Sequence, residues 1–119
     1  MTDTYTLTVS FESYDYDGEF YLLGEGYGTP SEVLQHVAAD HILRIDEAYV
    51  VEEYLLDVLK AGENTRKDEY DAVDADVECG IHFDVDYQRF SFWAGDRVFE
   101  IGERPTKSSL EEMADDLRA

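Results

Sequence analysis

The residues best able to do nucleophilic chemistry are one cysteine, Cys79, and three histidines, His36, His41 and His82. Cys79 lies on the apolar side of an alternating pattern, which is typical of a buried thiol and not of a reactive one. No sequence pattern brings a histidine beside Cys79 or beside a serine. The spacing of His36 and His41 also fits a helical metal-binding pair poorly. We therefore expect no catalytic residues, no metal and no cofactor, and a protein that is not an enzyme.

Three other segments resemble ligand-binding loops only superficially. The segments Asp15–Glu19 and Asp74–Glu78 carry alternating carboxylates, but position 12 of a calcium loop falls on Gly26 and Val85 in place of a glutamate. The glycine-rich segment 24–28 precedes an expected helix, where phosphates often bind, but it holds a glutamate and no lysine. We interpret the first two as solvated turns and the third as a flexible connection.

Carboxylates themselves are the dominant chemical group of this chain. Twenty-nine Asp and Glu face nine Lys and Arg, and the formal net charge is −20 at pH 7. A compact domain of this length has a radius of gyration of roughly 13–14 Å, whereas charges are screened only beyond about 8 Å. The carboxylates therefore repel one another and lower stability. Direct binding to nucleic acid or to an anionic membrane is disfavoured, because both need cationic residues at the contact.

Apolar periodicity predicts the strands that position these carboxylates. Residues 5–11 and 77–87 alternate between apolar and polar side chains, which favours two half-buried strands. Shorter patterns at 19–23, 90–93 and 98–101 predict three more. Turn residues after 11 and 93 indicate two hairpins.

The helices are predicted by their caps. Thr29, Pro30 and Glu32 form a capping box, so we expect a helix from about residue 30. Asp46 is expected to begin a second helix that continues to about residue 61, and the sequence leaves open whether residues 40–45 join the two helices or break them. A short C-terminal helix is expected after a cap at Ser108 or Ser109.

Together these elements predict one domain over residues 1–119. The order ββ, αα, βββ, α favours an α+β fold, with an antiparallel sheet of about five strands and two or three helices packed on one face. The 44% hydrophobic content argues against a disordered acidic tail. No apolar run approaches the length of a membrane span, and the start lacks a signal pattern, so we expect no membrane contact and a cytoplasmic location.

The charged surface suggests a binding function. If Asp84 and Asp86 lie on one strand face, their residues are roughly 6.6–6.8 Å apart, comparable to successive phosphates of a nucleic-acid strand. A cationic groove then binds such a surface by charge complementarity and counterion release. We predict a partner-binding surface made of an acidic turn and an acidic loop and strand: Asp15, Asp17, Glu19, Asp68, Glu69, Asp71, Asp74, Asp76, Glu78, Asp84 and Asp86.

Small size, extreme acidity and the tyrosine-rich acidic stretches Tyr14–Asp17 and Asp68–Asp71 resemble the DNA-mimic inhibitors of phages and mobile elements. These are the anti-restriction and anti-CRISPR proteins. The resemblance rests on size and composition, so no functional residue is carried over. It implies a non-enzymatic acidic inhibitor that mimics nucleic acid and occludes the basic nucleic-acid-binding surface of a nuclease or defence complex. If the chain is phage-encoded, it would act in the host cytoplasm.

Three alternatives stay open at this point. An immunity protein for a basic nuclease toxin would present the same kind of carboxylate surface to a single partner. An ordinary halophilic cytoplasmic domain also fits, because three Lys stand against six Arg and fifteen Asp. An enzyme that uses carboxylates on a small molecule would need an apolar pocket lined by converging acids.

Overall fold

A computed structural model of the chain describes residues 3–14, 17–48, 53–54, 64–65, 75–102 and 105–118. Its elements in chain order are β1 (Thr4–Glu12), β2 (Asp17–Glu25), α1 (Pro30–Val33), the π-helical segment η1 (Leu34–Ala38), α2 (Ala39–Ala48), β3 (Asn64–Thr65), β4 (Val77–Asp84), β5 (Arg89–Ala94), β6 (Arg97–Gly102) and α5 (Lys107–Arg118). The α+β class is confirmed.

The strands form one sheet in the order β3-β2-β1-β4-β5-β6, in which β3 has only two residues. The prediction of about five strands is confirmed by the five long ones, but the prediction of an antiparallel sheet is wrong at its centre. There β1 pairs in parallel with β4, while every other pair is antiparallel. The physical reason is the long connection after β2, which returns the chain to the end of the sheet where β1 starts. Hairpin signals report only neighbouring strands and carry no information about this pairing.

One continuous helix covers Pro30–Ala48, where the sequence analysis expects the end of one helix and the start of another. Segments α1, η1 and α2 follow one another without a break from Pro30 to Ala48. Asp46 therefore lies inside a helix, and the prediction that it begins a new one is wrong. The rest of the expected second helix falls mostly outside the described residues. With α5, the described residues contain two helices.

The caps explain where the two helices begin. Thr29 Oγ1 accepts a hydrogen bond from the Glu32 backbone N–H at 3.2 Å and donates one to Glu32 Oε1 at 3.0 Å, so the capping box is confirmed. At α5 the cap is Thr106, two or three residues before the expected serines. Its hydroxyl accepts from the Ser109 N–H at 3.1 Å, and Ser109 Oγ accepts from the Thr106 N–H at 2.9 Å.

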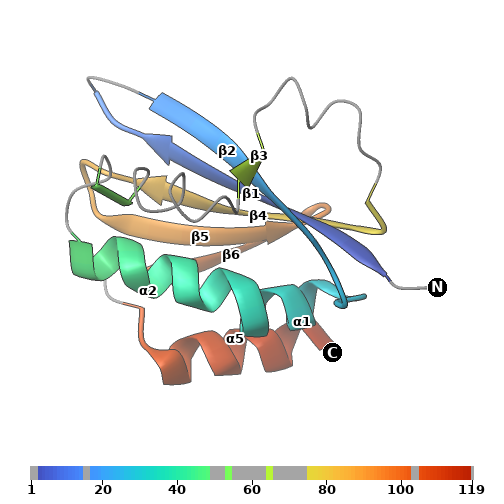
Figure 1. The fold of residues 1–119 in the computed structure, drawn as a ribbon. Coiled ribbons are helices and arrows are strands. Elements are labelled where there is room, and N and C mark those ends of the chain that lie inside the picture. The colour runs from blue at the N-terminus through green and yellow to red at the C-terminus, as the bar shows by residue number, and fades with distance from the viewer. Residues whose placement is uncertain are drawn as a thin grey trace.

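The core lies between one face of the sheet and the helices, which Figure 1 shows on the same side. Alternate residues of β1 and β4 point into it in register, with Leu7 beside Cys79 and Val9 beside Ile81. The helices contribute Val33, Leu34, Ala38, Ile42 and Leu110, each no more than 2% exposed. We call the other side of the sheet the polar face. It includes Thr8, Ser10, Glu12, Glu19, Gly80, His82, Asp84, Ser91 and Trp93.

Strand β4 ends earlier than its sequence pattern indicates. The alternation predicts a strand through Tyr87, but β4 stops at Asp84 and residues 85–88 form a turn. Asp84 Oδ1 accepts a hydrogen bond from the Tyr87 N–H at 3.2 Å, and Gln88 adopts a left-handed conformation with φ of 52°. The side chain of Asp84 thus closes the turn that ends the strand. Asp84 and Asp86 consequently do not share one strand face.

Candidate functional site

Acidic residues of three neighbouring strands lie at one end of the sheet. Glu12 on β1 stands opposite Asp17 on β2 and opposite Asp84 on β4. Neighbouring strands lie about 4.8 Å apart, so these three residues form one row across the sheet. Glu19 lies one row further in on the same face, and Asp86 follows in the turn after β4. We call Glu12, Asp17, Glu19, Asp84 and Asp86 the acidic end.

Hydrogen bonds hold several of these carboxylates in place. Asp86 Oδ2 accepts from the Tyr14 backbone N–H at 2.7 Å, which ties the turn after β4 to the end of β1. Asp84 is held by its own turn, and Glu19 Oε1 accepts from the Tyr21 hydroxyl at 3.0 Å. A carboxylate that is already fixed loses little conformational entropy when a cationic partner binds it.

The structure separates two of the other predicted carboxylates, Asp76 and Glu78, from the acidic end. Asp76 and Glu78 lie at the start of β4, about 20 Å away along the strand. Asp76 Oδ2 accepts hydrogen bonds from the Thr4 N–H at 3.0 Å and from Thr4 Oγ1 at 3.1 Å, so it joins the starts of β1 and β4. The predicted residues Asp15, Asp68, Glu69, Asp71 and Asp74 lie outside the described residues.

A serine, a histidine and a glutamate form a linked group next to the acidic end. Ser10 Oγ lies 2.9 Å from His82 Nδ1, and His82 Nε2 lies 3.2 Å from Glu12 Oε2. All three line a cavity of about 440 Å³ that Gly18 and Glu19 also border. The sequence analysis found no pattern that pairs a histidine with a serine. Ser10 and His82 are 72 positions apart, and only the parallel register of β1 and β4 brings them together.

The order of this group is that of a nucleophile, a base and a residue that orients the base. Acyl transfer also needs hydrogen-bond donors where negative charge develops on the substrate oxygen. Ser10 lies in the middle of β1, whose backbone pairs with β2 on one side and β4 on the other. The neighbouring backbone N–H groups are therefore engaged in the sheet. The Ile81 carbonyl oxygen lies 3.3 Å from Ser10 Oγ. The Ser10 hydroxyl can therefore donate its proton to this oxygen as well as to His82.

Cys79 lies on the core side of β4, and the prediction that its thiol is buried is confirmed. Its side chain is 0% exposed, and burial raises the pKa of the thiol from 9.0 to about 12. Desolvation of the thiolate is the cause, because a buried charge loses its hydration. Cys79 Sγ lies 3.8 Å from the Thr6 carbonyl oxygen. The thiol is therefore protonated and shielded at neutral pH.

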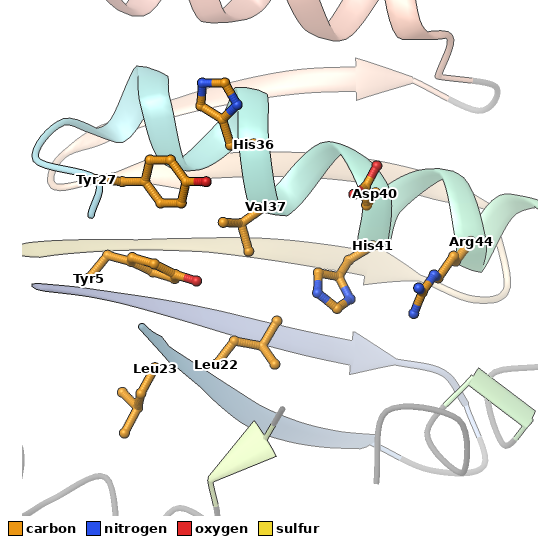
Figure 2. Close-up of a pocket in the computed structure, with 9 residues that line it drawn as sticks. All are labelled: Tyr5, Leu22, Leu23, Tyr27, His36, Val37, Asp40, His41 and Arg44. Atoms are coloured by element: carbon orange, nitrogen blue, oxygen red, sulfur yellow. The ribbon is translucent and has the colours of Figure 1, made fainter. Parts of the chain in front are cut away.

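A second cavity of about 470 Å³ opens between the long helix and strands β1 and β2, and we call it the helix–sheet cavity. Figure 2 shows the residues that line it. Three rings form one wall. The Tyr27 ring stacks on His36 with centroids 5.1 Å apart and planes 11° from parallel, and Tyr5 lies 5.7 Å from Tyr27.

The helix supplies the polar groups of this cavity. Val37, His41 and Arg44 extend toward the strands, while Asp40 lies on another side of the same helix (Figure 2). His41 is 6% exposed, and its Nδ1 forms a short hydrogen bond with the Tyr54 hydroxyl. Tyr54 is only 2% exposed and packs on Phe11 and on Phe20.

No group of three or more His, Cys, Asp or Glu side chains in the described ranges is arranged to hold a metal ion. Within those ranges, no helix is both long enough and apolar enough to cross a membrane.

Comparison with known proteins gives no relative on which to base a function. No protein-family model, no curated protein and no solved structure matches the chain.

Proposed function

We propose that this protein is a non-enzymatic inhibitor that mimics nucleic acid and occludes the basic surface of a nuclease or defence complex. The observation that carries the proposal is the acidic end. There three neighbouring strands and one turn bring five acidic residues to one end of the sheet, in a chain with a net charge of −20. The acidic end offers a cationic groove several negative charges at once.

The charges of the acidic end are only partly balanced by neighbouring bases. Arg89 stands opposite Asp84 on β5, and His82 contacts Glu12. The spacing of about 4.8 Å across the strands replaces the spacing along one strand that the sequence suggested. It brings the charges closer together, which strengthens their combined attraction for Lys and Arg side chains. Binding is then expected to weaken steeply with salt, as it does for a nucleic-acid ligand.

Competition with nucleic acid tests the proposal directly. The full chain is immobilised, proteins from the native host are retained at physiological ionic strength, and the resin is eluted with duplex DNA, with single-stranded RNA or with polyglutamate. We expect one nucleic acid to release the retained partner at concentrations where polyglutamate does not. If neither nucleic acid releases it, or if no cationic protein is retained, the proposal is wrong.

Once a partner is purified, a variant in which four carboxylates are neutralised tests whether the partner binds the acidic end. We choose Glu12→Gln, Glu19→Gln, Asp84→Asn and Asp86→Asn, because the amide oxygens still accept the hydrogen bonds that hold these side chains. Removing four carboxylates changes the net charge from −20 to −16. We expect affinity to fall about tenfold or more, because each exposed ion pair contributes about 0.2–1 kcal/mol. The affinity of this variant should also depend less steeply on salt concentration.

The matched control removes the same number of charges from exposed positions of α5. Its substitutions are Glu111→Gln, Glu112→Gln, Asp115→Asn and Asp116→Asn. Both variants have the same net charge, so only the position of the lost carboxylates differs. Equal loss of affinity in the two variants would show that overall charge, and not the acidic end, attracts the partner.

A further inference from the structure

The helix–sheet cavity does not depend on the function proposed for the acidic end. Its strand residues lie toward the start of β1 and the end of β2, whereas the acidic end is formed where β1 stops. Its volume of about 470 Å³ falls within the range of small-molecule sites. Such sites hold a few polar groups that fix the orientation of the ligand, and in this cavity polar groups make up the larger part of the exposed lining.

Arg44 is the distinctive polar group of this cavity. The chain has 29 carboxylates, yet Arg44 makes no ion pair within the part of the chain that the structure describes. Figure 2 shows its side chain extending from α2 into the space between the helix and the strands, beside His41. A guanidinium presents a planar fork of donors that matches a carboxylate.

Aromatic and aliphatic side chains form the rest of the cavity. Tyr5 and Tyr27 present rings on one side, and Leu22 and Val37 add aliphatic surface. The position of Tyr5 depends on Gly24, its cross-strand partner, because a Cβ at Gly24 would lie 2.5 Å from the Tyr5 hydroxyl oxygen. The glycine thus leaves room for the ring against β2. These walls suit a ligand with a planar apolar body.

We propose that the helix–sheet cavity binds a small aromatic monocarboxylate, with its ring against Tyr5 and Tyr27 and its carboxylate on Arg44. One guanidinium balances one negative charge. Asp40, one helical turn before Arg44, and the net charge of −20 both oppose a more highly charged ligand such as phosphate. With one guanidinium to pair with the ligand and one carboxylate to repel further negative charge, the cavity favours a monoanion.

Calorimetric titration of the full chain with phenylacetate tests the proposal, with phenylacetamide as its neutral analogue and inorganic phosphate as a second anion. We expect phenylacetate to bind about tenfold to a hundredfold more tightly than phenylacetamide, because hydrogen bonds to a charged group contribute about 1.5–3 kcal/mol. Inorganic phosphate should bind more weakly than phenylacetate. NMR shifts on phenylacetate binding should appear at the Tyr27 and Arg44 side chains.

Substitutions at three exposed positions test which side chains contribute to phenylacetate affinity. Arg44→Gln should weaken phenylacetate binding about tenfold or more, since it removes the charged donor. Asp40→Asn should strengthen phenylacetate binding, because it removes the negative charge of a carboxylate that lines the cavity. Arg89→Gln is the matched control, since it changes the net charge of the chain as Arg44→Gln does but lies on β5, and it should leave the affinity unchanged. Circular dichroism checks that each variant is folded.

Three results would overturn the proposal. The first is no phenylacetate binding by the folded wild-type chain up to about 10 mM, which is weaker than a specific site of this size provides. The second is equal affinity of Arg44→Gln and Arg89→Gln for phenylacetate. The third is binding of phenylacetamide or of inorganic phosphate as tight as that of phenylacetate.

Discussion

The two faces of the sheet are built from the same strands but differ in the polarity of their side chains and in how far many of these are exposed. On the core face, Val9, Ile81 and Phe92 are each 0% exposed and pack beneath the helices. On the polar face, the side chains of His82 and Glu12 are 36% and 68% exposed. The period-two alternation of each strand is what separates the two environments.

The comparison shows why so acidic a chain can fold. Stability comes from apolar area buried on the core face, where the described residues place no carboxylate. The acidic side chains that the structure describes are exposed or half-buried, so water solvates them. Charge can therefore accumulate at the acidic end at a modest cost in stability.

The largest expected effect comes from emptying one position of the core face. Phe92→Ala should lower the free energy of unfolding by about 3–5 kcal/mol, because it leaves a cavity among packed residues. Its neighbour Ser91 points to the polar face, and Ser91→Ala should change stability by less than about 1 kcal/mol. Urea unfolding of the two variants measures the contrast. Similar losses would mean that the two faces are not as different as their burial indicates.

A smaller effect is expected where the polar face is itself tightly packed. A Cβ at Gly80 would lie 2.3 Å from the Trp93 indole, so Gly80→Ala must displace that ring. We expect a loss of about 1–3 kcal/mol, typical of overpacking. Trp93 is the single tryptophan, so its fluorescence reports the displacement. Unchanged emission together with unchanged stability would contradict the close packing of Gly80 and Trp93.

The buried thiol of the core face predicts a pH dependence. In the unfolded chain Cys79 ionises near its ordinary pKa of 9.0, whereas in the folded chain its pKa is about 12. Between these values the unfolded state binds fewer protons, so stability falls as pH rises, by at most about 1.4 kcal/mol per pH unit from this group. Urea unfolding at pH 8 to 11 should show a smaller decline for Cys79→Ala. An equal decline would remove Cys79 as a cause.

The smallest effect is expected from a single charge of the polar face. Glu12→Gln keeps an oxygen that can accept from His82 and removes one negative charge, so stability should change by only a few tenths of a kcal/mol. The difference should vanish at high salt because the repulsion is screened. Thermal unfolding at low and high salt measures this difference in stability.

The wild-type chain should be folded in dilute buffer, and a requirement for molar salt would favour the halophilic alternative.

Local patterns in the sequence predicted much of the fold. The alternation around Leu7 and Ile81 identified the two central strands and their core face, and Thr29 marked the helix start. Errors arose where two local signals competed. Ile42 and Ile45 continue the helical period, but Asp46 resembles a cap, so the sequence predicts a new helix start at a residue that lies inside α2. The turn formed by Asp84 ended a strand whose alternation continues beyond it.

The candidate sites were less predictable because they depend on long-range register. The sequence gathered the acids of β2 and of β4 into one surface, but it also included Asp76 and Glu78, which the parallel strand carries to the other end. The contact between Ser10 and His82 had one sequence signal, namely that both stand at polar positions of alternating strands. That signal fits many pairs, and only the register of β1 against β4 selects this one.

The parallel pairing of β1 with β4 also has a consequence for folding kinetics. The β1–β2 hairpin and the β4–β5–β6 meander are each local in sequence, so each can form early. The two units join only when β1 meets β4 across the intervening helix, a contact of high sequence separation and high loop-closure entropy. We expect this docking step to limit the refolding rate, with strand β6 at the far edge contributing mainly to the rate of unfolding.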